Sequence, residues 1–236
     1  MKRLFALAAL LMLAACQSPS GQMNAKIISG QTGTLETADG YSIAYSYLAA
    51  PGSRGVILLH MLGGSKEDYA DFAQQLHTAG FAVIAIDFRG HGDSSGAINT
   101  FKDEDYRKFT LDVKAAKQFL KEQGIHYVGI VGASIGANTA LNYAVTDPDV
   151  RTLVLISPGE DYHGVKTAES AKRYTERILF VAAKDDDYSA LSAQRLAKLA
   201  YKQSLQLYPS GGHGTRLFAK TDLNRIARDW LVQYVR

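Results

Sequence analysis

The stretch Gly132-Ala133-Ser134-Ile135-Gly136 decides the fold of this chain, because it joins two segments of different type. The apolar run 127–131 before it is typical of a buried strand, and 137–145 after it is helix-like. In that context Gly-x-Ser-x-Gly predicts a sharp turn that holds a strained serine above a sheet, with glycines where the chain folds back on itself. A glycine-rich turn that only packs a helix closely is the alternative. The flanking segments favour Ser134 as a nucleophile.

The chain on either side of this turn alternates between strand-like and helix-like segments. Asp39-Gly40 predicts a hairpin between strands at 34–38 and 41–48. Apolar periodicity predicts further strands and helices; the strands are 56–60, 82–87, 153–157, 178–183 and 205–208, and the helices 67–78, 106–120 and 223–234. An opening hairpin followed by such alternation predicts an α/β fold, with a mostly parallel eight-stranded sheet and helices on both faces.

Three kinds of candidate catalytic residue follow strands of this sheet, where ligands of parallel sheets bind. Ser134 follows one strand directly, the run 185–187 of aspartates follows another, and His213 follows the last. A serine hydroxyl is a poor nucleophile at neutral pH, so it needs a base such as His213 within hydrogen-bond reach. A carboxylate must in turn hold the imidazole. The order Ser, Asp, His therefore predicts a catalytic triad.

These residues and two further loops resemble the α/β-hydrolase superfamily across residues 34–236. His60 with Gly63-Gly64 resembles the family's oxyanion loop, and the run 87–94 resembles its Asp-x-Arg-Gly-His-Gly-x-Ser loop. The resemblance implies the α/β-hydrolase fold. Many relatives carry a lid domain between the strands at 153–157 and 178–183, where this chain has only a short connection. The chain is thus most similar to small, lidless serine esterases, including dienelactone-hydrolase-like members.

The resemblance also indicates which aspartate belongs to the triad. In the family the acid commonly stands three residues after a small residue that ends the strand, and counting from Ala183 gives Asp186. Asp185 is the alternative acid, and Asp187 is expected to cap the next helix. The acidic pair at 160–161 is less favoured, although some relatives place the acid there.

The oxyanion of a tetrahedral intermediate requires preorganised donors. The backbone N–H of Ile135 is one expected donor, and by resemblance that of Leu62 is the other. Met61 departs from the pattern, because relatives have glycine after the histidine. Two consequences are open: its side chain narrows the pocket, or Met61 itself is the oxyanion donor. The expected pocket walls flank strand ends and are Met61, Tyr162 and Tyr188.

The predicted function is cleavage of small or short-acyl carboxylic esters through an acyl-enzyme. A thioesterase or peptidase using the same triad is the alternative, as is a non-catalytic binding module of the same fold. No metal is expected, because no histidine pair has ligand spacing, and no cofactor, because no Gly-x-Gly-x-x-Gly follows a first strand. The chain has no dense Lys/Arg cluster, so nucleic acid is not an expected partner.

The N-terminus predicts where the protein resides. Lys2 and Arg3 precede an apolar run at 4–13 and then Leu13-Ala14-Ala15-Cys16, which resembles a bacterial lipoprotein signal. Cleavage would remove residues 1–15 and lipidate Cys16, the single cysteine of the chain. Residues 16–33 are expected to form the lipidated end and a flexible tether. Gln17 suggests the periplasmic side of the outer membrane in a Gram-negative host; an ordinary secretory signal is the alternative.

Overall fold

The computed structural model describes residues 30–236. The predicted lipoprotein signal, Cys16 and most of the predicted tether lie outside the described residues. The ten strands of the described part are β1 (Gln31–Glu36), β2 (Ser42–Leu48), β3 (Arg54–Leu59), β4 (Ala82–Ile86), β5 (Tyr127–Ala133), β6 (Val150–Ile156), β7 (Asp161–Tyr162), β8 (Val165–Lys166), β9 (Arg177–Ala183) and β10 (Lys202–Tyr208). The α-helices are α1 (Ala70–Thr78), α2 (Asp103–Arg107), α3 (Phe109–Glu122), α4 (Ile135–Ala144), α5 (Ala168–Arg173), α6 (Asp187–Leu199), α7 (Leu217–Lys220) and α8 (Leu223–Tyr234). Short 3-10 helices are η1 (Lys66–Tyr69), η2 (Ile98–Thr100) and η3 (Gly214–Arg216).

Eight of these strands form one sheet in the order β1-β2-β4-β3-β5-β6-β9-β10. β2 is antiparallel to both of its neighbours, and every pair from β4 to β10 is parallel. The prediction of a mostly parallel eight-stranded sheet is therefore confirmed. Because β5, β9 and β10 run in the same direction, the residues that follow them lie at one edge of the sheet.

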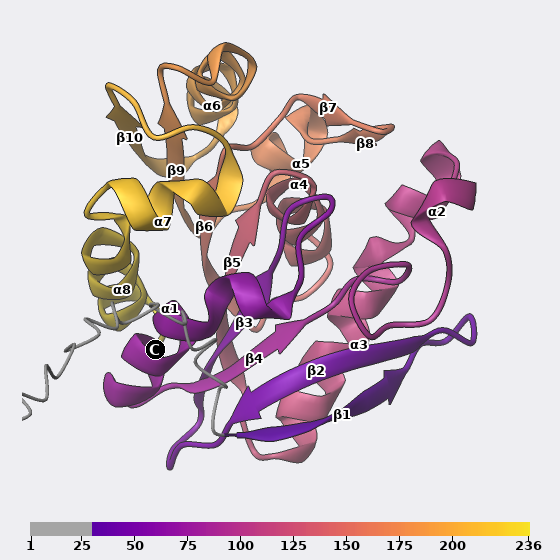
Figure 1. Ribbon diagram of the computed structural model, residues 1–236. Coiled ribbons are helices and arrows are strands. Elements are labelled where there is room, and N and C mark those ends of the chain that lie inside the picture. The colour runs from indigo at the N-terminus through magenta and orange to yellow at the C-terminus, as the bar shows by residue number, and fades with distance from the viewer. Residues whose placement is uncertain (1–29) are drawn as a thin grey trace, which may run out of the picture.

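Helices cover both faces of the sheet, with α1 and α8 on one side and α3 and α4 on the other (Figure 1). The two faces bury separate apolar clusters, as alternation along a strand requires. In β4, for example, Ile84 and Ile86 pack with α3 and α4, whereas Val83 and Ala85 pack with α1 and α8. Burial of these side chains from water is the main stabilisation of the fold.

Several element boundaries differ from those predicted. β1 begins at Gln31 rather than residue 34, because its register with β2 pairs Gln31 with Tyr47. Residues 31–33 thus belong to the sheet and not to the predicted tether. β1 is mostly exposed and polar, so it carries little apolar periodicity from which its start could be predicted. The predicted helix 106–120 is two helices, α2 and α3.

The segment between β6 and β9 contains the β7–β8 hairpin and the six-residue helix α5. The sequence predicted only a short connection here and not the hairpin, because its two strands have two residues each, too few for a periodic pattern. No large lid stands over the sheet within residues 30–236. Among the same residues, no helix combines the length and apolar character needed to span a membrane.

Candidate active site

Ser134 occupies the turn between β5 and α4. Its backbone is at φ 54° and ψ −118°, a strained conformation for a residue with a side chain. A Cβ at Gly136 would lie 2.5 Å from the carbonyl oxygen of Leu59, so the turn requires glycine there. The Ser134 N–H donates to the carbonyl of Ile156 at 2.9 Å, which ties the turn to β6. The predicted strained serine between a strand and a helix is therefore present.

His213 connects Ser134 to Asp186. Its Nε2 lies 2.7 Å from Ser134 Oγ, and its Nδ1 lies 2.7 Å from a carboxylate oxygen of Asp186. A carboxylate only accepts, so Nδ1 carries the proton and Nε2 is free to accept from the serine hydroxyl. The serine is 5% exposed, and the side chains of His213 and Asp186 are 34% and 14% exposed. His213 is therefore the most exposed member of this chain of hydrogen bonds.

Two buried serines hold the Asp186 carboxylate in place. Burial acts to raise the pKa of Asp186, but hydrogen bonds from His213, Ser189 and Ser157 outweigh it and keep the pKa below its usual value. Asp186 is thus ionised at neutral pH and able to stabilise a positive charge on the imidazole. Ser157 also accepts the N–H of Gly214 at 2.9 Å, which fixes the residue after His213.

Sequence reasoning missed both serines. Ser157 and Ser189 are completely buried, and only the fold brings them to the same carboxylate. Ser157 stands directly after β6 with φ 49°, and that place at a strand end is the one signal from which it could have been found.

Asp185, the alternative acid, turns away from His213. Both of its carboxylate oxygens accept the N–H groups of Gly211 and Gly212, at 3.0 to 3.2 Å. These bonds lower the pKa of Asp185. Asp185 therefore anchors the loop that leads to His213.

The other acidic candidates do not contact the imidazole either. Asp187 is the first residue of α6 and not its cap, so that prediction was wrong; Asp186 occupies the position before the helix. Glu160 pairs with Arg195 at 2.7 Å, and Asp161 accepts the N–H of Gly164 at 2.8 Å. Both carboxylates thus bind other groups in or beside the β7–β8 hairpin and not His213.

Of the expected oxyanion donors, Ile135 directly follows Ser134 in the chain, and Leu62 lies on the loop after β3. Ile135 is the first residue of α4, so its N–H has no acceptor within the helix. Ile135 is 1% exposed and its side chain belongs to the core, so its expected role concerns the backbone N–H and not the side chain. The Leu62 side chain is 38% exposed, at the surface of the loop after β3.

His60 fixes the orientation of the loop that carries Leu62. The N–H of Phe88 donates to His60 Nε2 at 2.9 Å, so Nδ1 bears the proton and donates to the Met61 carbonyl at 2.7 Å. The Met61–Leu62 peptide is trans, and its N–H therefore points away from that carbonyl. Burial lowers the pKa of His60 to about 4, which keeps this tautomer neutral at physiological pH.

An ion pair supports the same loop from behind. Asp87 is fully buried and accepts both the backbone N–H of Lys66 at 2.6 Å and its Nζ at 2.8 Å. Lys66 Nζ also contacts Asp93 at 2.7 Å. Because Lys66 opens η1 directly after the loop that carries Leu62, this pair joins the loop after β3 to the loop after β4.

The predicted pocket residues surround His213 unevenly. The ring of Tyr162 lies 6.1 Å from that of His213, and its hydroxyl contacts Ser189 Oγ at 3.0 Å. Tyr188 is 46% exposed and donates to the Asp161 carbonyl at 2.8 Å. Met61 approaches from the opposite loop, with its sulfur 3.8 Å from the Thr215 hydroxyl. Tyr162 and Met61 thus lie beside His213 and the residues that follow it, whereas Tyr188 packs against Tyr162.

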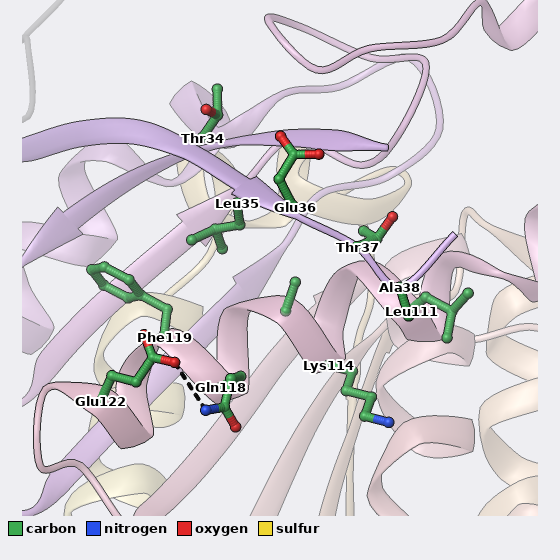
Figure 2. A pocket seen from close by; sticks show the side chains of 11 residues that line it. Thr34, Leu35, Glu36, Thr37, Ala38, Leu111, Lys114, Gln118, Phe119 and Glu122 are labelled. Carbon is green, nitrogen blue, oxygen red and sulfur yellow. Dashed lines mark hydrogen bonds between the residues drawn. The ribbon is translucent and has the colours of Figure 1, made fainter. Parts of the chain in front are cut away.

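A separate groove of about 520 Å³ lies between β1 and α3 (Figure 2). Residues Thr34 to Ala38 form one wall, and Leu111, Lys114, Gln118 and Phe119 line the other. Three strands separate β1 from β5 in the sheet, so this groove is not part of the serine site. Within residues 30–236 no cluster of three or more His, Cys, Asp or Glu side chains is arranged to hold a metal ion.

Curated relatives match only part of this chain. A probable alcohol acetyltransferase of Cyberlindnera fabianii is 36% identical over 96 residues, which are 40% of this chain and 24% of the relative. An sn-1-specific diacylglycerol lipase of Mus musculus is 29% identical over 126 residues, 52% of this chain and 39% of the lipase. The chain thus covers a quarter to two fifths of the length of these relatives.

Solved structures match nearly the whole described part. An esterase of Pyrococcus furiosus superposes with a TM-score of 0.73 at 17% identity, over 87% of this chain and 93% of that one. An esterase of Exiguobacterium antarcticum gives 0.72 at 15% identity, over 85% and 99%. At such identities the likeness concerns the fold. The family model described as "alpha/beta hydrolase fold" matches residues 55–209, most of the chain, and the sheet order and serine turn agree with it. The chain therefore belongs to the α/β-hydrolase fold family.

Proposed function

We propose that this protein is a serine hydrolase that cleaves carboxylic esters through an acyl-enzyme intermediate. The observation that carries the proposal is the continuous hydrogen-bonded chain from Ser134 Oγ through His213 to Asp186, with both links at 2.7 Å. A fold of this kind does not by itself imply catalysis, but a strained, buried serine in contact with an oriented imidazole is the arrangement that nucleophilic catalysis requires.

In the proposed mechanism His213 Nε2 takes the proton of Ser134 as Oγ attacks the ester carbonyl. Asp186 stabilises the imidazolium, and the N–H groups of Ile135 and Leu62 receive the negative oxygen. The imidazolium then protonates the departing alcohol. Water, deprotonated by the same imidazole, releases the acid in the second half of the cycle.

The proposed substrates are small or short-acyl esters. The segment between β6 and β9 supports this. It contains the β7–β8 hairpin, whose strands have two residues each, and α5, but no lid domain that could enclose a long acyl chain. The aromatic rings of Tyr162 and Tyr188, whose centroids are 5.5 Å apart, form a short apolar wall on that side. The esterases of Pyrococcus furiosus and Exiguobacterium antarcticum, which share the fold, support esters as the substrates.

A fluorophosphonate probe and a panel of p-nitrophenyl esters of increasing acyl length test the proposal. Wild type should label with the probe and hydrolyse acetate and butyrate esters faster than long-chain esters. Ser134→Ala should lose labelling and about 10⁶ in kcat, as loss of a triad nucleophile typically does. Ser204→Ala, on the exposed part of β10, is the matched control and should behave as wild type. Labelling of Ser134→Ala at the wild-type rate would exclude Ser134 as the nucleophile.

We also propose that the enzyme is anchored to the bacterial envelope through lipid on Cys16. The support is the N-terminal sequence alone, where the single cysteine follows Leu13-Ala14-Ala15. Wild type grown with a palmitate analogue should carry the label and sediment with membranes, because two or more acyl chains give stable anchoring. Cys16→Ser should lose the label. Wild-type protein cleaved at another position and found entirely in the soluble fraction would contradict the anchor without affecting the hydrolase proposal.

A further inference from the structure

Met61 is the one sulfur-containing residue within residues 30–236. The other three methionines, at positions 1, 12 and 23, and the single cysteine precede this range. Met61 also stands where the hydrolase loop usually has glycine, so its side chain is an addition to the site. Met61 is partly exposed as a residue, so it is not sealed within the core.

The Met61 side chain packs on the loop that carries His213. A Cβ placed on Gly214 would lie 2.6 Å from the Met61 sulfur and 3.5 Å from its Cβ, so the thioether lies directly on the backbone of Gly214. The Thr215 hydroxyl donates to the same sulfur at 3.8 Å. Met61 therefore bridges the proposed oxyanion loop and the two residues that follow the proposed base.

The contact leaves little room for a larger group. Gly214 is held from its other side, because its N–H donates to the buried Ser157 at 2.9 Å. Any atom added to the Met61 sulfur toward this loop must therefore displace either the oxyanion loop or the segment around His213.

We propose that Met61 is an oxidation site at which a two-electron oxidant of the peroxide class switches the enzyme off; the effect on turnover rests on the proposed hydrolase function. The sulfur lone pair attacks one peroxide oxygen, an S–O bond forms and the O–O bond breaks. The released hydroxide takes the proton of the new S–OH group and leaves as water. Sulfur is oxidised by two electrons and the peroxide is reduced by two, giving methionine sulfoxide.

The sulfoxide differs from the thioether in size and polarity. The sulfoxide oxygen is a stronger hydrogen-bond acceptor than the thioether sulfur, so the Thr215 hydroxyl binds it more strongly. The added oxygen also requires space beside Gly214. Catalysis depends on the distance between Ser134 and His213, and a displacement of about 1 Å is enough to lower turnover on the order of 10²-fold. Reduction of the sulfoxide restores the original side chain, so the switch is reversible.

Hydrogen peroxide treatment of the full-length protein tests the proposal, with mass spectrometry of the peptides that contain Met61 and Met23. Met61→Leu removes the proposed site with little change in volume. Met23→Leu is the matched control, which retains Met61. In wild type and Met23→Leu, p-nitrophenyl acetate turnover should fall about tenfold or more in step with Met61 sulfoxide. Met61→Leu should keep its own untreated rate, whatever that rate is. Methionine sulfoxide reductase should restore wild type.

The ring N–H signals of His213 in an NMR spectrum give a readout that does not depend on turnover. They should shift when Met61 is oxidised and stay unchanged in treated Met61→Leu. If the untreated protein hydrolyses no ester, the proposed function fails. The His213 signals and the peptide masses then still test whether Met61 is oxidised and whether its oxidation affects His213. The inference is overturned if Met61 stays reduced while Met23 is oxidised. It is equally overturned if Met61 is oxidised and neither the His213 signals nor turnover, where present, change.

Discussion

The choice between two adjacent aspartates gives the sharpest test of the proposed mechanism. Asp186→Asn should reduce kcat for p-nitrophenyl acetate on the order of 10⁴-fold, which corresponds to about 5 kcal/mol of transition-state stabilisation. Asp185→Asn, one residue earlier, should cost less than about tenfold, because the Asp185 carboxylate accepts the N–H groups of Gly211 and Gly212 and does not contact His213. An asparagine oxygen still accepts from such donors.

The large effect at position 186 follows from the donors around the carboxylate. Ser157 and Ser189 both donate to Asp186. In Asp186→Asn these hydroxyls should retain the amide oxygen and leave the NH₂ group facing His213 Nδ1. An NH₂ donor there requires an unprotonated Nδ1, which moves the imidazole proton to Nε2. Nε2 then cannot accept the proton of Ser134, although the shape of the site is unchanged.

The assay is steady-state hydrolysis of p-nitrophenyl acetate by wild type and both variants, with thermal unfolding as a control for folding. Both variants should unfold within a few degrees of wild type, since asparagine and aspartate have nearly the same volume. Equal damage from the two substitutions would refute the reasoning, as would an Asp186→Asn rate within tenfold of wild type. If only Asp185→Asn were damaging, the acid would be the residue whose carboxylate faces the Gly211-Gly212 backbone.

Three further substitutions test the supports of the site. Ser157→Ala should lower the free energy of unfolding by about 1–3 kcal/mol, because it leaves the buried N–H of Gly214 without its acceptor; a urea titration showing wild-type stability would contradict this. Gly136→Ala should destabilise by at least about 1–3 kcal/mol and lower turnover, since its Cβ would meet the Leu59 carbonyl oxygen at 2.5 Å; unchanged urea midpoint and kcat would show that the turn can relax. His60 has a pKa of about 4 in the folded protein and 6.5 when unfolded. Its contribution to the free energy of unfolding is therefore complete above pH 6.5, and about 3 kcal/mol of it is lost as the pH falls to 4. Between these two pH values wild type should lose more stability than His60→Gln, and parallel stability curves would count against a neutral buried His60.

The sequence was sufficient for the fold because its signals are local. The two glycines of the serine turn, the Asp39-Gly40 hairpin and the long buried runs each depend on residues adjacent in the chain. Strand type and helix type follow from apolar periodicity, and the sheet class follows from their order. Where that pattern is weak, the prediction failed. The predicted start of the polar edge strand β1 was three residues too late, and the very short strands β7 and β8 were not predicted.

Tertiary structure alone decided which groups meet. The family's spacing favoured Asp186 over its neighbour Asp185, but only the structure shows that Asp185 anchors Gly211 and Gly212 while Asp186 contacts His213. Likewise, nothing in the sequence relates Ser157 to Asp186 or Met61 to Gly214. Whether two groups form a hydrogen bond depends on differences of a few tenths of an ångström in their separation and on the direction of each side chain. Those quantities are set by the packing of loops that are far apart in sequence, which is why a motif predicts the chemistry of a site but not its partners.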